Sequence, residues 1–196
     1  MSIGWDGIPN MFLKKYSNTL AIPLCHIFST SFLDGCLPAS WKYSIVTPIH
    51  KKGPTSDSNN FRPVSLTATC CRVMEGVINN QLLRYLLDRH LITRKQHGFI
   101  KRKSVCTNML ECLEDWTLNF QARHVTDVIY FDFKKAFDTV CHNKLLSILK
   151  SYGISGKLLS WIEAFLCGRS QCARMGEAIS AAVLFLLLMV FLKEVC

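Results

Sequence analysis

Residues 125–140, with the sequence VTDVIYFDFKKAFDTV, join an apolar run to a short polar turn. The first part, residues 125–133, is rich in β-branched and aromatic residues, which predicts a buried β-strand. Alternation along that strand places Val128, Tyr130 and Asp132 on one side, so a carboxylate stands near the end of an apolar strand. A carboxylate held rigidly in this way suits Mg²⁺, whereas the plainer alternative is that Asp132 only caps the following turn.

The residues that follow this strand predict a pair of short helices. Phe137 comes five positions after Asp132, so its ring is expected near the same end of the strand. Asp138 comes six positions after it, and we interpret Asp138 as the N-cap of a helix over residues 139–150 rather than as a metal ligand. A second helix is predicted over residues 157–167, and the glycines between the two helices end the first one.

The region upstream of the strand is strongly basic. Residues 84–103 carry seven cationic side chains and one acid, a net charge of +6, in a chain whose formal net charge is +9. Such a segment is either a solvated surface or a face that follows the phosphates of nucleic acid. His97, in the middle of it, is interpreted as a packed or exposed loop residue and is assigned no chemistry.

Periodic apolar spacing predicts three upstream helical segments, residues 10–32, 71–87 and 105–120. The first is expected to be interrupted at Pro23 and to end near Gly35. Between the first two helical segments, residues 41–49 are β-branched and aromatic, which predicts a strand. The polar run at residues 51–60 predicts a loop.

Composition limits the class of protein. With 196 residues, the chain is long enough for one domain with a core. Hydrophobic residues at 49% and charged residues at 19% exclude a disordered chain. The 10 cysteines are scattered and form no C-x-x-C pair, so reduced thiols are expected rather than a disulfide framework or a zinc site.

The segment YFDFKKAFDTV, residues 130–140, resembles the first catalytic motif of the reverse transcriptases of non-LTR retrotransposons, the LINE-type and jockey-like elements. Other blocks of that family are matched in order along the chain. They are GWDGIP at 4–9, WK at 41–42, VTPIHKKG at 46–53, NFRPVSL at 60–66 and QHGFIKRKS at 96–104. Each block alone is a weak signal, so the strength of the resemblance lies in their common order.

The resemblance implies an α+β fold, the fingers of a right-hand polymerase with an incomplete palm. We therefore expect a helical lead-in at 1–40, a fingers-like region at 41–124, the start of the palm at 125–180 and an apolar divergent tail at 181–196. The implied activity is that of an RNA-directed DNA polymerase, with Mg²⁺ as cofactor and an RNA template, a DNA primer and dNTPs as partners. Together with the unbalanced charge, the resemblance favours nucleic-acid contact by Arg94, Lys95, Lys101, Arg102 and Lys103.

Carried over position by position, the resemblance makes Asp132 the first metal-binding catalytic aspartate, with the backbone carbonyl of Phe133 as a further metal ligand. Phe137 corresponds to the bulky residue beneath the sugar of the incoming nucleotide, where a ring clashes with a 2′-hydroxyl. Lys51 and Arg62 correspond to the fingers cations that approach the triphosphate. The alternative for this pair is a solvated loop.

The sequence departs from the family near residues 178–180. The family carries two more carboxylates in a downstream Tyr-x-Asp-Asp block, and this sequence contains no adjacent pair of aspartates. Two-metal phosphoryl transfer requires ligands on both ions, so we expect a truncated reverse transcriptase that is inactive as an isolated chain. A noncatalytic nucleic-acid-binding remnant is the alternative function.

Residues 181–192 form an unbroken apolar run of 12 residues. A membrane-spanning helix needs about 20 apolar residues, so a membrane partner is not expected and a membrane-associated protein is the less favoured alternative. The run is expected to form a buried terminal helix or an exposed, aggregation-prone strand. An intracellular compartment, cytoplasm or nucleus, is favoured, and the sequence makes no prediction about oligomeric state.

Overall fold

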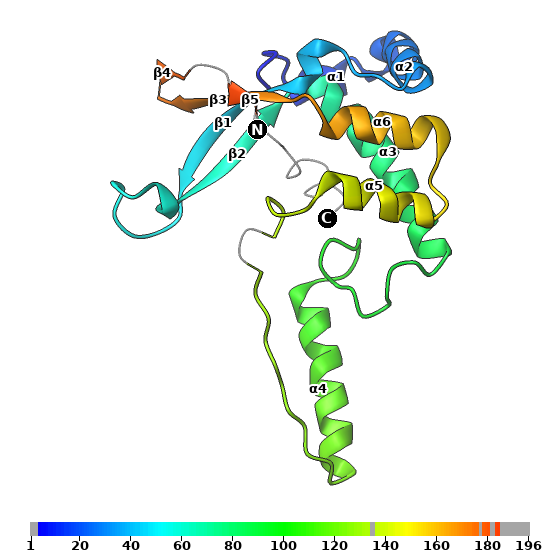
Figure 1. The fold of residues 1–196 in the computed structure, drawn as a ribbon, viewed down its shortest axis with the longest axis vertical. Helices are drawn as coiled ribbons and strands as arrows, with labels where there is room; N and C mark the ends of the chain where they lie inside the picture. The colour runs from blue at the N-terminus through cyan, green and yellow to red at the C-terminus, as the bar shows by residue number, and fades with distance from the viewer. Residues whose placement is uncertain (1–3, 134–135, 177, 181–182, 185–196) are drawn as a thin grey trace.

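A computed structural model of the chain describes residues 4–133, 136–176, 178–180 and 183–184. The structure is mixed α+β, as the sequence predicts, with a small sheet at one end of a group of helices (Figure 1). One helix, α4 (Val105–Gln121), extends away from the rest of the molecule together with the irregular segment that follows it (Figure 1).

The sheet is built around a hairpin. Its strands are β1 (Tyr43–His50), β2 (Phe61–Thr67), β3 (Ser170–Met175), β4 (Ala178–Ile179) and β5 (Val183–Leu184). β1 and β2 pair antiparallel, which confirms the strand predicted at 41–49 and the loop at 51–60. β3 pairs in parallel with the other edge of β1, from Tyr43↔Ser170 to Val46↔Ala173, and β4 and β5 pair antiparallel with β3. The parallel pair needs a long crossover, which α3 to α6 provide.

The other helices match the predicted segments closely. They are α1 (Asn10–Lys15), α2 (Ser17–Asp34), α3 (Thr69–Asp88), α5 (His142–Ser151) and α6 (Gly156–Leu166), with the short 3-10 turns η1 (Ala39–Lys42) and η2 (Ser58–Asn60). Pro23 lies inside α2 and does not interrupt it; the break falls at Tyr16 instead. α2 ends as predicted at Gly35, whose φ of 62° is the left-handed conformation that glycine adopts without strain.

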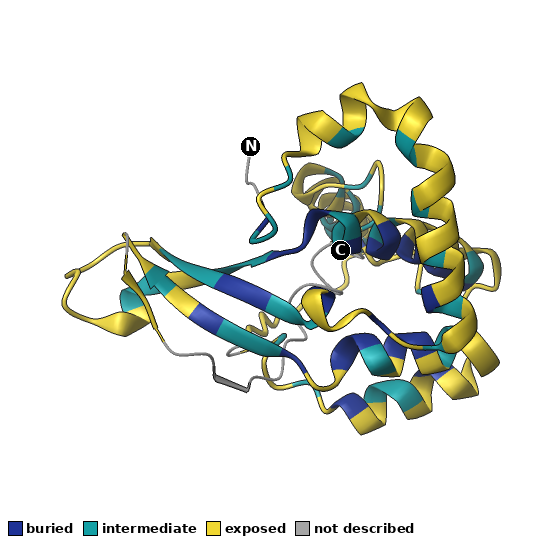
Figure 2. Cartoon of the chain, turned by 90° about the horizontal axis from the view of Figure 1, so that it is seen from above, coloured by how far each residue is buried: buried dark blue, intermediate teal, exposed yellow. Residues whose placement is uncertain are grey.

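The core draws most of its buried side chains from α3 and α6, and Figure 2 shows the buried residues gathered in the helical part of the molecule and along the sheet. Met74, Ile78 and Leu82 form the buried stripe of α3, whereas Val73 and Val77, which the same apolar spacing assigned to the core, are 40% and 55% exposed. Trp161 and Phe165 of α6 stack with ring centroids 5.4 Å apart. The remaining apolar members of the core are Leu37, Trp41, Ala68, Cys71, Leu86, Leu149, Ile154, Ile162 and Leu166. This packing fixes the helical body from which the hairpin and α4 project.

The strand predicted over residues 125–133 does not form. The segment is irregular and exposed, with Val125 at 92% and Tyr130 at 83% of full exposure. A β-strand is stable only when its backbone is hydrogen-bonded to a neighbouring strand, and within the described parts of the chain no strand pairs with these residues. Asp132 therefore follows an irregular segment rather than the end of a strand.

The interpretation of Asp138 as an N-cap is also wrong. α5 begins at His142 and Cys141 occupies its N-cap position, without a side-chain capping bond. Residues 136–139 form a separate turn in which Thr139 Oγ1 donates to the carbonyl of Ala136 at 3.2 Å. Asp138 therefore lies within this turn, three positions before the N-cap residue of α5.

No helix in the described residues is long and apolar enough to cross a membrane. Most of the apolar run at 181–192 lies outside the described residues, so its predicted burial stays a prediction. The described cysteines are free thiols.

Candidate nucleic-acid and nucleotide interface

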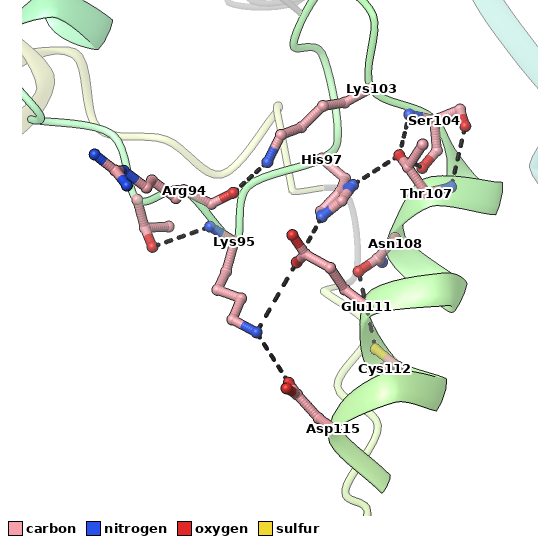
Figure 3. A network of polar contacts seen from close by, with 11 residues as sticks. Arg94, Lys95, His97, Lys103, Ser104, Thr107, Asn108, Glu111, Cys112 and Asp115 are labelled. Carbon is pink, nitrogen blue, oxygen red and sulfur yellow. Dashed lines mark hydrogen bonds and ion pairs between the residues drawn. The ribbon is translucent and has the colours of Figure 1, made fainter. Parts of the chain in front are cut away.

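The loop between α3 and α4 carries the predicted nucleic-acid contacts, and His97 pins it to α4 (Figure 3). His97 is only 7% exposed; its Nδ1 lies 2.9 Å from Thr107 Oγ1, and its Nε2 donates to Glu111 Oε2 at 3.0 Å. Thr107 and Glu111 are four residues apart and so share one face of α4. His97 is thus a packed residue, as interpreted from the sequence, and its role in holding the loop is an addition from the structure.

The start of α4 is fixed by the same residues. Ser104 Oγ accepts from the Thr107 amide at 3.2 Å while the Ser104 amide donates to Thr107 Oγ1 at 2.8 Å, which forms a capping box. The hydrogen bond from His97 lowers the pKa of the Glu111 carboxyl below its ordinary value of 4.5. Glu111 is therefore held in the charged form that the imidazole N–H favours.

Two of the five predicted cations stabilise the loop itself (Figure 3). Lys95 Nζ donates to Asp115 Oδ2 at 2.9 Å and lies 4.0 Å from Glu111 Oε2. The hydrogen bond to Asp115 raises the pKa of the Lys95 ammonium group. Lys103 Nζ donates to the backbone carbonyl of Arg94 and closes the loop on itself. The ammonium groups of both lysines therefore already interact with oxygen atoms of the protein.

The other three cations point their charge at solvent. Arg94, Lys101 and Arg102 are exposed. Within the described part of the chain, no ion pair or side-chain hydrogen bond engages them. Unpaired cations on a pinned loop can meet phosphates without first breaking an internal contact. They are the members of the predicted set with charge available to a polyanion.

The predicted triphosphate cations lie together on the β1–β2 hairpin. Arg62 pairs directly with Ile49 across the hairpin, and Lys51 follows Ile49 by two positions. The Lys51 amide continues the ladder by donating to the Asn60 carbonyl at 2.8 Å. Because side chains alternate along a strand, Lys51 and Arg62 share one face as diagonal neighbours, a spacing of about 7–8 Å in antiparallel pairs. Both are exposed.

The polar loop behind these cations is held by local bonds. His50 Nε2 lies 2.8 Å from the Gly53 carbonyl, and Asn60 Nδ2 donates to the Pro54 carbonyl at 2.9 Å. The rings of His50 and Phe61, which pair across the hairpin, meet edge to face at 5.3 Å. The hairpin end is therefore ordered by contacts that leave the Lys51 side chain free of the loop.

Asp132, Phe133 and Phe137 lie on a different segment, the irregular connection between α4 and α5 (Figure 1). Asp132 and Phe133 are exposed, whereas Phe137 is half-buried and its ring meets that of Phe99. No group of three or more His, Cys, Asp or Glu side chains that could hold a metal occurs among the described residues. Those residues supply one candidate carboxylate and do not fit a complete Mg²⁺ site.

Sequence reasoning missed Thr107, Glu111 and Asp115 as partners of the basic loop. The available signal was their spacing of four along one predicted helix, which indicates a shared face but not what packs on it. It also missed the ring contact between Phe99 and Phe137, residues 38 positions apart, for which no local pattern exists.

Comparison with known proteins identifies the family of the chain. The sequence model of the reverse transcriptase (RNA-dependent DNA polymerase) family matches residues 49–185, more than half of the chain. The chain belongs to the reverse transcriptase family.

Its relatives include polymerases of non-LTR retrotransposons. The chain is 26% identical over 150 residues to a probable RNA-directed DNA polymerase from transposon BS of Drosophila melanogaster, covering 76% of this chain and 17% of that protein. It is 24% identical over 178 residues to a probable RNA-directed DNA polymerase from transposon X-element of Drosophila melanogaster, covering 90% of this chain and 20% of that protein. It is 28% identical over 144 residues to the RNA-directed DNA polymerase from mobile element jockey of the same species, covering 73% of this chain and 16% of that protein. The chain spans about one fifth or less of the length of these relatives.

Proposed function

We propose that this chain is the fingers and the beginning of the palm of a retrotransposon RNA-directed DNA polymerase, with fingers over 41–124 and palm from 125. In this proposal the exposed cations of the α3–α4 loop contact the phosphates of an RNA template and a DNA primer. Membership of the reverse transcriptase family supports it, as do relatives that are described as RNA-directed DNA polymerases.

The observation that carries the proposal is the hairpin pair. Lys51 and Arg62 stand on one face, exposed, at the diagonal spacing at which two long side chains converge on one polyanion. An arginine fork holds two phosphate oxygens and a lysine supplies a compact charge, so together they suit the triphosphate of a dNTP. Phe137 is proposed to lie beneath the sugar and exclude a 2′-hydroxyl.

In this proposal the chain binds its ligands but lacks part of what the polymerisation reaction needs. Asp132, with the Phe133 carbonyl, would contribute to a metal ion, and such an ion lowers the barrier by stabilising the attacking and leaving oxygens. One carboxylate alone leaves two ions short of protein ligands, and the sequence has no Asp-Asp pair. We therefore propose that the chain binds nucleic acid and dNTP but extends a primer only when carboxylates from outside this sequence complete the palm.

Substitution of the two hairpin cations tests the proposal directly. Saturation-transfer NMR on the 196-residue chain can measure weak binding of dTTP. Either Lys51→Ala or Arg62→Ala is expected to lower the affinity for dTTP several-fold. Lys52→Ala is the matched control, because Lys52 is exposed, carries the same charge and is offset by one position from Lys51. Equal losses in all three variants would mean that the hairpin attracts anions without a site.

The noncatalytic remnant is the competing function, and it predicts a different pattern. A remnant binds single-stranded RNA through the loop cations and shows no dTTP binding that depends on the hairpin. Binding of RNA together with absence of dTTP saturation transfer would favour the remnant over the polymerase fragment.

A further inference from the structure

Phe99 connects the basic loop to the segment that carries the proposed catalytic residues. Its ring meets that of Phe137 edge to face, with centroids 6.0 Å apart and an interplanar angle of 70°. This geometry lies within the attractive range of aromatic pairs, because the positive edge of one ring faces the negative face of the other. Phe99 itself is exposed and Phe137 half-buried, so the contact covers the Phe137 ring from the loop side.

The backbone at Phe99 is strained in a way that fixes this ring. Its φ is +72°, a left-handed conformation that is rare for a bulky residue and persists only where neighbouring contacts hold it. Such contacts occur on both sides of Phe99 in the sequence. Two residues before it, His97 is hydrogen-bonded to side chains of α4, and four residues after it, Lys103 donates to the Arg94 carbonyl. The direction of the Phe99 ring is thus set by the pinned loop.

We propose that Phe99 is a positioning residue that holds the Phe137 ring against the sugar of the incoming nucleotide and so sets discrimination against ribonucleotides. The inference rests on the proposed function, in which Phe137 excludes a 2′-hydroxyl. A ring excludes that hydroxyl only while it stays in one orientation, and the edge-to-face contact with Phe99 favours the orientation in which the two rings meet. The loop with Arg94, Lys101 and Arg102 therefore also determines which sugar fits.

The test compares dTTP with its ribonucleotide, 5-methyl-UTP, because the two differ only in the 2′-hydroxyl. Saturation-transfer NMR on the 196-residue chain, with each nucleotide as its magnesium complex, measures the ratio of the two affinities. Phe99→Gly is expected to reduce the preference for dTTP about two- to tenfold, the worth of one aromatic pair, while the affinity for dTTP changes less than twofold. Glycine adopts the positive φ without strain, so this variant keeps the loop conformation.

Two matched variants separate positioning from general damage. Phe99→Tyr keeps the ring and is expected to keep the preference. Phe120→Ala removes another exposed phenylalanine, 83% exposed against 47% for Phe99, at the far end of α4 and is expected to leave the preference unchanged. Loss of preference in Phe120→Ala, or in Phe99→Tyr, would contradict a specific role for the ring at 99.

A double variant distinguishes failure of this inference from failure of the proposed function. If Phe99 acts through Phe137, Phe99→Gly adds nothing to Phe137→Val. If Phe137→Val abolishes the preference and Phe99→Gly leaves it intact, the positioning role is overturned and the proposed function stands. If the wild-type chain binds both nucleotides equally, Phe137 is not a sugar gate and this inference is overturned, whereas the proposed function is judged separately by the dependence of dTTP binding on Lys51 and Arg62.

Discussion

Arg169 lies 1% exposed between α6 and β3, a position where an arginine is rare unless it has partners. Its guanidinium donates to the carbonyl of Phe165 at 3.0 Å and to that of Trp41 at 3.2 Å, and its Cζ lies 4.7 Å from the centroid of the Phe165 ring. Burial lowers the pKa of Arg169, and Cys71 and Glu75 oppose that effect. The side chain thereby ties the end of α6 to η1, the turn that leads into β1.

Arg169→Leu is expected to lower the free energy of unfolding by about 2–4 kcal/mol, because two buried carbonyls lose their donor. Urea denaturation measures this. Arg84→Leu, on the exposed face of α3, is the control and should change the free energy by less than about 0.5 kcal/mol. A loss no larger than in the control would mean that Arg169 is not a structural donor.

Glu111 makes the anchoring of the loop dependent on pH. Its pKa in the folded chain is lowered below 4.5, first by the hydrogen bond from His97, so its stabilising effect is complete above that pH and is lost as the pH falls through the folded value. The difference in unfolding free energy between wild type and Glu111→Gln should therefore be constant near neutral pH and shrink below pH 4.5. A difference that persists unchanged at pH 3 would contradict this assignment.

The five predicted cations of the α3–α4 loop fall into two groups, those bonded within the protein and those exposed to solvent and so able to contact a polyanion. Lys95 and Lys103 are engaged within the loop and with α4, whereas Arg94, Lys101 and Arg102 are exposed. Sequence reasoning could find the net charge of the segment but could not make this division. The division depends on Asp115 and on the Arg94 carbonyl, which come within hydrogen-bond distance of Lys95 and Lys103 only in the folded chain.

Replacing Arg94, Lys101 and Arg102 by Ala should weaken binding to a primed RNA template and flatten the slope of log affinity against log salt by up to about one unit per lost phosphate contact. Fluorescence anisotropy in a KCl series measures the slope. Lys95→Ala is the control from the same loop, and its slope should change much less because Asp115 already neutralises that charge. An unchanged slope in the triple variant would remove this loop from the interface.

In the whole molecule, the helices other than α4 form a body from which the β1–β2 hairpin and α4 project (Figure 1), and the connection between α4 and α5 that carries Asp132 is largely exposed. The 196 residues contain no Asp-Asp pair to join Asp132 in the proposed palm. Appending the downstream palm segment of a related element after Ser180 should supply the missing strands and carboxylates together. Residues 125–133 would then gain the partner that their composition anticipates.

We expect no Mg²⁺-dependent primer extension by the 196-residue chain and measurable extension by the chain with the appended palm. Asp132→Asn in the completed chain should abolish extension, because the substitution removes a charged metal ligand. A gel-based extension assay on a primed RNA template measures both. Extension by the unmodified chain that Asp132→Asn eliminates would show that the remaining ligands lie within this sequence.

Local pattern predicted the elements whose stability is local or periodic. The helices at 71–87 and 105–120 were predicted because apolar spacing follows the helical turn, and the 41–49 strand because β-branched residues precede a polar loop. β3 was missed because its sequence, SQCARM, has no clear alternation, and it pairs with a strand more than 100 residues earlier. The strand predicted at 125–133 was wrong for the converse reason, since its pattern is present but no strand among the described residues pairs with it.

The sequence by itself determined the family, the net positive charge, the helical periods and the identity of the candidate residues, because these depend on residue order and type alone. The tertiary structure decided which cations are free, that Lys51 and Arg62 share a face, that Arg169 is a buried donor and that Phe99 meets Phe137. Each of these depends on contacts between distant segments. Such contacts arise from packing and strand register, which place side chains according to the whole fold and not according to their neighbours in the chain.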